Sequence, residues 1–188
     1  MLKSLSEYGK WIYIVGYKNF KLKNAKSLLN KIREIIDSSV EVQFFNADLV
    51  ATWQHLYFAT LNAVMAMQTK RNISKSLAVE VLLYASAQRQ ISKAIELIGV
   101  NNDCNNIAAV IIGENDESVK KAYSIISNFL KLEENMDVFG TSDSKNREIK
   151  RIFGITDEEL QASYRADKSA DPLVLAVLER IALLSTQI

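Results

Sequence analysis

The stretch WIYIVGYKNFKLKNAKSLLNKIREII, residues 11–36, contains both kinds of element from which the fold is built. Its first part, residues 11–17, is aromatic and β-branched, which is typical of a buried strand. Its second part predicts an amphipathic helix over residues 24–36. The apolar positions of this helix share one face: Leu28, Leu29, Ile32 and Ile35. The chain therefore opens with a strand followed by a helix.

Further strands and helices follow in an irregular order. The β-branched runs at 41–45 and 107–112 predict two more strands, and 136–139 is expected to be a short edge strand. Helical periodicity predicts helices at residues 47–67, 74–84, 88–98, 117–132 and 147–153. The acid Asp48 is placed near the start of the first, and Gly99 is a natural end for the third. This order predicts an α+β fold with a small mixed sheet covered by helices.

The length and hydrophobic content favour one compact domain. The chain has 188 residues, of which 48% are hydrophobic, so residues 1–188 can bury a sound core. A polar connector is expected near residues 140–171, with a charged part at 157–169. The single proline, Pro172, then opens a C-terminal helix over 172–186, at a position where its missing N–H costs nothing.

The overall charge excludes one class of function. The 23 basic and 22 acidic side chains nearly cancel, whereas a protein that coats nucleic acid needs excess positive charge. Any nucleic-acid contact must therefore be local. The first ten residues, MLKSLSEYGK, are polar where a secretory signal would be apolar, and no apolar run approaches the roughly 20 residues of a membrane span. We therefore expect a cytoplasmic protein without a membrane contact.

Catalytic and metal-binding patterns are sparse. The six glycines form no phosphate-binding loop, and one cysteine with one histidine cannot make a zinc cluster. His55 lies in a helical segment beside apolar residues, which favours a structural role over that of a general base. Cys104 is better explained as a passive loop thiol than as a nucleophile. We therefore expect no cofactor, no metal and no catalytic residue, and an enzyme using His55 or Cys104 is the weakest alternative.

Positive charge is concentrated in one region. Residues 70–93 contain one acid, Glu80, and five basic residues: Lys70, Arg71, Lys75, Arg89 and Lys93. The local balance of +4 predicts a docking site for an anion. If Ser74 caps the helix that follows, the remaining amides at that end add an anion site.

The residue types in this region also suit single-stranded RNA. Asn72 offers an amide that can read a base edge, Ile73 an apolar wedge and Tyr84 a ring for base stacking. The alternative is a plain helix cap with solvated lysines and a core tyrosine. Arg89 and Gln90 are open in the same way, because they can either bind a ligand or brace the preceding helix.

A longer pattern resembles a known family. The run RNISKSLAVEVLLYASAQRQISKAIELIGV, residues 71–100, is similar to the small regulatory subunit of the KEOPS complex, the family that includes human TPRKB. The stretches QHLYFATLNA, residues 54–63, and VLERIALL, residues 177–184, support the resemblance. It covers most of the chain, although residues 141–172 match no motif.

The resemblance implies a non-catalytic subunit of the complex that installs threonylcarbamoyladenosine (t6A) on tRNA. Such a subunit binds and stimulates the atypical kinase/ATPase subunit and grips the 3′ CCA end of tRNA. It meets the threonylcarbamoyltransferase subunit only indirectly, and we expect a monomer outside the complex. On this chain the tRNA site comprises Lys70, Arg71, Asn72, Ile73, Ser74, Lys75, Tyr84, Arg89 and Gln90.

The C-terminal helix is apolar nearly all round, so it is either a core helix or also covers a partner. We expect one face to point inward: Leu173, Val177, Ile181 and Leu184. The other face, Leu175, Leu178 and Ala182, is expected to meet the kinase. The alternative to an RNA-binding subunit is a protein-interaction module that only regulates the kinase and does not bind RNA itself.

Overall fold

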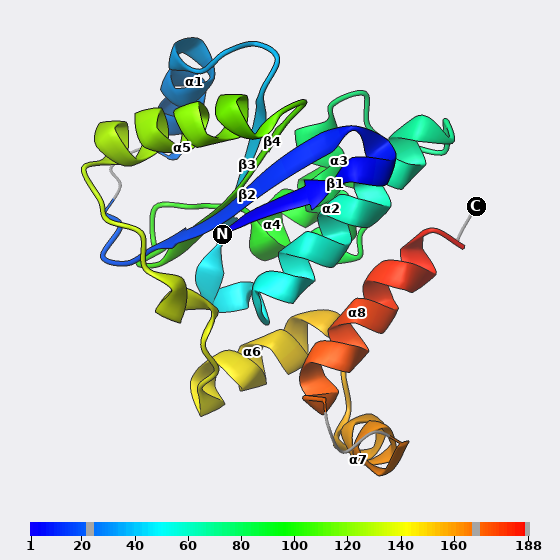
Figure 1. The fold of residues 1–188 in the computed structure, drawn as a ribbon. Coiled ribbons are helices and arrows are strands. Elements are labelled where there is room, and N and C mark those ends of the chain that lie inside the picture. Colours follow the sequence, from blue (N-terminus) through cyan, green and yellow to red (C-terminus); the bar gives the residue numbers. More distant parts are fainter. Residues whose placement is uncertain (22–24, 167–169, 187–188) are drawn as a thin grey trace. The chain divides into compact units, whose positions relative to one another are not determined.

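The computed structural model describes residues 1–21, 25–166 and 170–186. Its contacts divide the chain into two compact units (Figure 1). Unit 1 comprises Met1–Asp48 and Gly99–Val138, and unit 2 comprises Leu49–Ile98 and Phe139–Ile188. An antiparallel sheet in unit 1 and helices in both units confirm the α+β class. The single domain stays a prediction, and the expected helix start at residue 24 and connector residues 167–169 lie outside the described residues.

Unit 1 is built on a four-stranded sheet in the order β1-β2-β4-β3. The strands are β1 (Leu2–Leu5), β2 (Lys10–Tyr17), β3 (Glu41–Asn46) and β4 (Ile107–Gly113). The strands expected at 11–17, 41–45 and 107–112 are thus confirmed. All three pairings are antiparallel, so the expectation of a mixed sheet was wrong.

The small alanines of the central strand β4 make room for larger neighbours. Ala109 is paired with Val15 of β2 on one side and with Phe44 of β3 on the other. Every residue of β4 is buried, which is what its unbroken run of apolar residues requires.

The structure differs from the prediction at the first strand and at the last expected strand. Strand β1 was missed, because four residues with a lysine and a serine carry little strand signal. The edge strand expected at 136–139 was wrong, because Met136–Phe139 forms the 3-10 helix η3. The bridge to Tyr17 is made two residues earlier, by Glu134.

Two helices of unit 1, α1 (Ala25–Ile35) and α5 (Asp116–Leu130), lie side by side over the sheet (Figure 1). Asn115 caps α5 by accepting a 2.8 Å hydrogen bond from the Ser118 amide. On α1, Ile32 is buried and Leu28 packs against the core, as expected, but Ile35 is 42% exposed. Leu29 lies outside the described side chains. The core between sheet and helices includes Val15, Tyr17, Phe44, Ile111, Val119 and Ile126.

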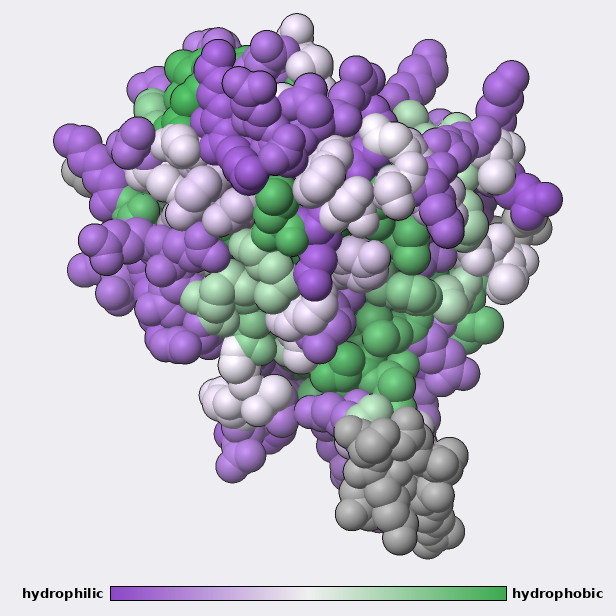
Figure 2. Space-filling model, in the orientation of Figure 1, coloured by the Kyte–Doolittle hydropathy of each residue, from purple (hydrophilic) through white to green (hydrophobic). Residues whose placement is uncertain are grey.

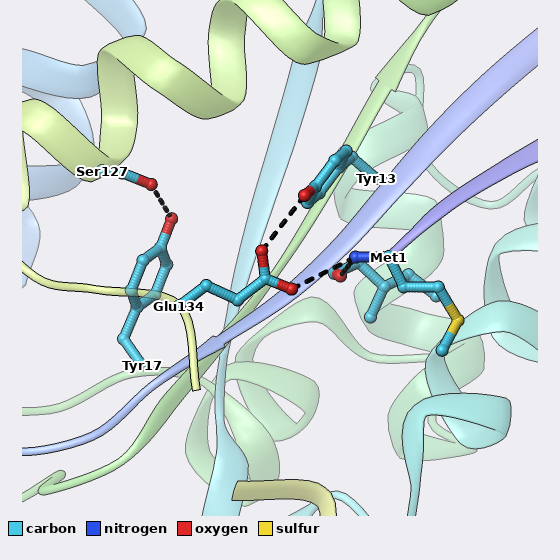
Figure 3. Close-up of polar contacts among 6 residues, drawn as sticks. Met1, Tyr13, Tyr17, Ser127 and Glu134 are labelled. Carbon is cyan, nitrogen blue, oxygen red and sulfur yellow. Dashed lines mark hydrogen bonds and ion pairs between the residues drawn. The ribbon is translucent and has the colours of Figure 1, made fainter. Parts of the chain in front are cut away.

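A polar network fixes strand β2 to the segment after α5 (Figure 3). The Glu134 carboxylate accepts hydrogen bonds from the Tyr13 hydroxyl at 3.1 Å and the Met1 ammonium at 3.4 Å. The hydroxyls of Tyr17 and Ser127 lie 2.8 Å apart. Burial raises the pKa of both tyrosines, so both hydroxyls keep their protons in the ordinary pH range.

Unit 2 consists of helices. They are α2 (Trp53–Gln68), α3 (Leu77–Ser86), α4 (Ile91–Ile98), α6 (Asp143–Phe153), α7 (Asp157–Ala166) and α8 (Pro172–Leu184). Helix α8 packs against α2, α3, α6 and α7, and α3 packs against α2 and α4. In the described parts of the chain, no helix combines the length and apolar character needed to cross a membrane.

Two expectations about the ends of helices were wrong. Helix α2 begins at Trp53, because Ala47–Leu49 forms the separate 3-10 turn η2. Asp48 lies in that turn, where its carboxylate accepts a 2.8 Å hydrogen bond from Asn106. Helix α4 ends at Ile98 as expected, but Gly99 is not a left-handed cap, and it forms an isolated bridge with Phe45.

The polar connector expected near residues 140–171 is largely helical. Helix α6 is capped by Ser142, whose hydroxyl accepts a hydrogen bond from the Lys145 amide, and it buries Ile149 and Phe153. Helix α7 follows, and its Glu159 pairs with Arg180 of α8 at 2.8 Å. Among the described side chains, Arg147, Glu148, Asp157 and Glu158 are exposed, so much of the charge that indicated a connector lies on the outer faces of short amphipathic helices.

Candidate functional site

The loop between helices α2 and α3, residues 69–76, is called the basic loop here. Lys70 has a φ of 57°, in the left-handed region, and the Arg71 amide donates a 2.9 Å hydrogen bond back to the Ala66 carbonyl. This is the pattern of a Schellman turn, which reverses the chain at a helix C-terminus. The turn leaves Lys70 and Arg71 exposed, and Lys75 is exposed further along the same loop.

The cap of helix α3 is Ser76, so the prediction that Ser74 caps this helix was wrong. The Ser76 hydroxyl accepts a 3.4 Å hydrogen bond from the Val79 amide. Ser74 is buried, and its hydroxyl instead accepts a 3.2 Å hydrogen bond from the Ser76 amide. Ser74 therefore supports the turn before the cap and is not on the surface.

Glu80 determines how this loop is held. Its carboxylate accepts hydrogen bonds from the Ile73 amide, at 3.0 and 3.1 Å, and from the Ser74 amide, at 2.7 Å. The side chain is only 1% exposed. The amides of Ile73 and Ser74 are thus occupied by the chain's own carboxylate, and the exposed cations of the loop are available to a ligand.

Tyr84 lies one turn after Glu80 and is buried, with 5% of its surface exposed. Burial raises the pKa of its hydroxyl, the charge of Glu80 raises it further, and the charge of Arg89 lowers it. The phenol is therefore near both charged groups, so the structure brings Glu80, Tyr84 and Arg89 into one neighbourhood. Its ring has no open face for stacking, contrary to the prediction from the sequence.

Arg89 and Gln90 lie exposed in the turn between α3 and α4. Ala87 makes this turn possible, with a φ of 51° and a hydrogen bond from the Gln88 amide to the Leu83 carbonyl at 3.0 Å. Asn72 is partly buried, and its amide donates a 2.9 Å hydrogen bond to the Ser74 carbonyl. Part of its hydrogen-bonding capacity therefore already serves the loop.

Sequence reasoning missed two exposed isoleucines on helix α4. Ile91 is 43% and Ile95 is 53% exposed, while Ala94 and Ile98 on the same helix are buried. The spacing of Ile91 and Ile95 by four residues was the available signal, because it places them on one face. Ile73, which was predicted as an apolar wedge, is 37% exposed in the basic loop.

His55 is fully buried and serves as a structural residue. Its Nδ1 accepts a 3.2 Å hydrogen bond from the Ala51 amide, so Nε2 carries the proton and donates to the Ala85 carbonyl at 2.7 Å. Its ring also meets Phe153 edge to face. Burial lowers the pKa of His55 to about 4, with a smaller contribution from the charge of Lys145. The ring is therefore neutral at pH 7 and in contact with no open site.

Cys104 is likewise buried in its loop. Its thiol donates a 3.4 Å hydrogen bond to the Asn101 side chain and accepts one from the Asn101 amide. Burial raises the pKa of this thiol, which disfavours the reactive thiolate. Within the described ranges, no group of three or more His, Cys, Asp and Glu side chains is arranged to hold a metal ion.

Helix α8 has the inward face that was predicted. Leu173, Val177, Ile181 and Leu184 are all buried, and Asp171 caps the helix by accepting a 2.8 Å hydrogen bond from the Leu173 amide. The other predicted face is partly exposed: Leu175, Leu178 and Ala182. Figure 2 shows hydrophobic side chains gathered over α8 on this face of the molecule. The helix thus combines a buried face with an apolar surface.

Two comparisons with known proteins agree with each other and confirm the resemblance found in the sequence. The sequence model of the family described as "Kinase binding protein CGI-121" matches residues 17–185. The "Regulatory protein Cgi121" of Methanocaldococcus jannaschii is 34% identical over 151 residues, which cover 80% of this chain and 88% of that protein. The matched range includes both the basic loop and helix α8. The chain therefore belongs to the CGI-121 family of kinase-binding regulatory proteins.

Proposed function

We propose that this chain is a non-catalytic cytoplasmic subunit of the complex that installs threonylcarbamoyladenosine on tRNA. In this proposal it binds the 3′ CCA end of tRNA and also binds and stimulates the kinase/ATPase subunit, which in turn contacts the transferase subunit. Family membership supports the kinase contact. The RNA contact is supported by the exposed cations of the basic loop.

The observation that carries the RNA proposal is the separation of charge around the loop. Lys70, Arg71 and Lys75 are exposed, whereas Glu80, the only acid between residues 70 and 93, is buried beneath the loop. The net local charge of +4 is therefore carried on the surface by basic side chains, while the acid is buried. An exposed group of this kind attracts phosphates, and the overall charge of +1 confines that attraction to this place.

The structure also changes which groups do the binding. The amides of Ile73 and Ser74 are occupied by Glu80, and Tyr84 is buried, so neither contributes directly. The contacts fall instead to Lys70, Arg71 and Lys75, with the exposed Ile73 beside them and Arg89 and Gln90 at the end of α3. Positive charge that follows the sugar–phosphate backbone is one of the features by which proteins bind single-stranded nucleic acid.

The test compares the affinity of the protein for one tRNA, intact and with its 3′ CCA removed, at a single salt concentration. We expect a strong loss on trimming, and a loss of about 1–3 kcal/mol in the folded variants Arg71→Ala and Lys75→Glu. Lys31→Ala, which removes an exposed cation from α1 in unit 1, is the matched control and should bind like the wild type. Equal binding of intact and trimmed tRNA would remove the CCA proposal.

The partly exposed apolar face of α8 supports a second candidate, a module that regulates the kinase without binding RNA. The two differ when the kinase is absent. If the isolated chain binds neither form of tRNA but still binds the kinase, the second candidate replaces the first.

A further inference from the structure

We infer that Glu80 is a positioning residue for RNA, which holds the basic loop in its binding conformation from beneath. This inference rests on the proposed RNA-binding function and deepens it. Glu80 itself cannot touch the RNA, because its side chain is 1% exposed. Its effect must therefore pass through the loop residues that its carboxylate holds.

The geometry of the carboxylate carries the argument. Its oxygens accept from two successive amides, those of Ile73 and Ser74, across seven and six residues of sequence. Hydrogen bonds to an ionised acceptor are about twice as strong as neutral ones, and burial excludes competing water. The middle of the loop is thus fixed to helix α3 at the point between Arg71 and Lys75.

Neighbouring contacts complete the support. Asn72 donates to the Ser74 carbonyl at 2.9 Å, and the Ser74 hydroxyl accepts from the Ser76 amide at 3.2 Å. Each of these contacts is local, whereas the Glu80 carboxylate connects the middle of the loop to the first turn of α3. A loop ordered before binding loses less conformational entropy on binding, which raises affinity without an added contact.

Charge and positioning predict opposite results for one substitution. Glu80→Gln removes the only acid among five basic residues and changes the local balance from +4 to +5. Electrostatics alone would therefore strengthen RNA binding. If Glu80 positions the loop, the variant binds more weakly, because an amide oxygen is a poorer acceptor and its NH₂ group opposes the backbone amides.

The experiment measures tRNA affinity, kinase affinity, thermal unfolding and the rate of trypsin cleavage after Lys70, Arg71 and Lys75. For Glu80→Gln we expect tRNA binding about tenfold weaker and faster cleavage in the loop, with kinase binding unchanged. Glu80→Asp keeps the charge but shortens the reach, and it should weaken tRNA binding in the same direction. It also provides the test if Glu80→Gln does not fold. Glu96→Gln removes an exposed acid from α4 and should bind tRNA as well as or better than the wild type.

A folded Glu80→Gln that binds tRNA at least as tightly as the wild type would overturn the inference. If Arg71→Ala and Lys75→Ala weaken binding in that case, the proposed function survives and only the role of Glu80 is wrong. If those two variants also bind normally, the RNA site itself is wrong and the inference falls with it.

Discussion

The Nε2 atom of His55 lies 2.7 Å from the carbonyl oxygen of Ala85, which follows it by 30 residues. The same ring accepts the Ala51 amide through Nδ1. One neutral imidazole thus connects the segment before α2 to the last turn of α3, deep inside unit 2. Because both ring nitrogens are used, protonation would break one of these hydrogen bonds.

Stability should therefore fall in mild acid. The pKa of His55 is about 4 in the folded protein and about 6.5 when unfolded, so the unfolded chain binds the additional proton between these values. The neutral histidine contributes fully above pH 6.5, and roughly 3 kcal/mol is lost as the pH falls from 6.5 to 4. Chemical denaturation across this range measures the loss.

His55→Gln separates this effect from the titration of carboxylates, because its amide can still donate to Ala85 but cannot take up a proton. The difference in unfolding free energy between wild type and variant should be constant above pH 7 and should shrink toward pH 4. A difference that does not change with pH would show that His55 is not held neutral.

Leu178→Glu should abolish or strongly weaken kinase binding without unfolding the chain. Leu178 is only partly buried on α8, so a carboxylate there can reach water in the free protein but not in an apolar interface. Co-purification with the kinase, together with thermal unfolding, measures both effects.

Leu183→Glu is the matched control, because Leu183 is 44% exposed on the same helix but outside the predicted face. It should retain the kinase. Retention by a folded Leu178→Glu would show that this face of α8 is not the contact.

Ala87→Gly should stabilise the chain by about 0.5–1 kcal/mol, because a left-handed φ costs alanine more than glycine. Ala78 lies within α3, the helix that Ala87 caps. Ala78→Gly also removes one methyl group, but at a helical φ, and should destabilise the chain by about 1 kcal/mol. Urea denaturation compares the two. Opposite signs are expected, and destabilisation by both would contradict the strain at Ala87.

Gly113→Ala should destabilise unit 1 by about 1–3 kcal/mol, because its Cβ would lie 2.6 Å from Ser118 Oγ and 2.9 Å from Val119 Cγ1. The end of β4 can approach the start of α5 only without a side chain at this position. Adding Ser118→Ala removes the nearer contact and should restore part of the loss in thermal unfolding. A Gly113→Ala variant as stable as the wild type would show that α5 can move away.

The sequence predicts most of the elements because their patterns are local. The β-branched run at 11–17 and the apolar run at 107–112 are strands as expected, and Pro172 opens α8. Strand β1 was missed because it has only four residues, two of them polar, and helix α7 was missed because its composition is polar. Each is stabilised by its neighbour, β2 for the strand and α8 for the helix, and local sequence does not report that packing.

The site was harder to predict than the fold. Two serines, Ser74 and Ser76, precede α3, and either could cap it. The buried Glu80 accepts a hydrogen bond from the Ser74 amide and so supports a turn there, and Ser76 becomes the cap. The sequence does contain a signal for the burial of Tyr84. The segment LAVEVLLYAS is apolar nearly all round, which predicts a helix that is buried on every side. The spacing of Ile91 and Ile95 places them on one face of α4, but periodicity alone does not tell which face packs against α3 and which stays exposed.

The inward position of Tyr84 has a consequence for the selection of tRNAs. An exposed ring would hold the face of a base, whereas the loop presents ammonium and guanidinium groups to solvent instead. Such groups hold the sugar–phosphate chain, which is the same in every tRNA. In the proposed function, this subunit would therefore accept tRNAs alike, and the choice among anticodons would belong to the subunits at the other end of the bound tRNA.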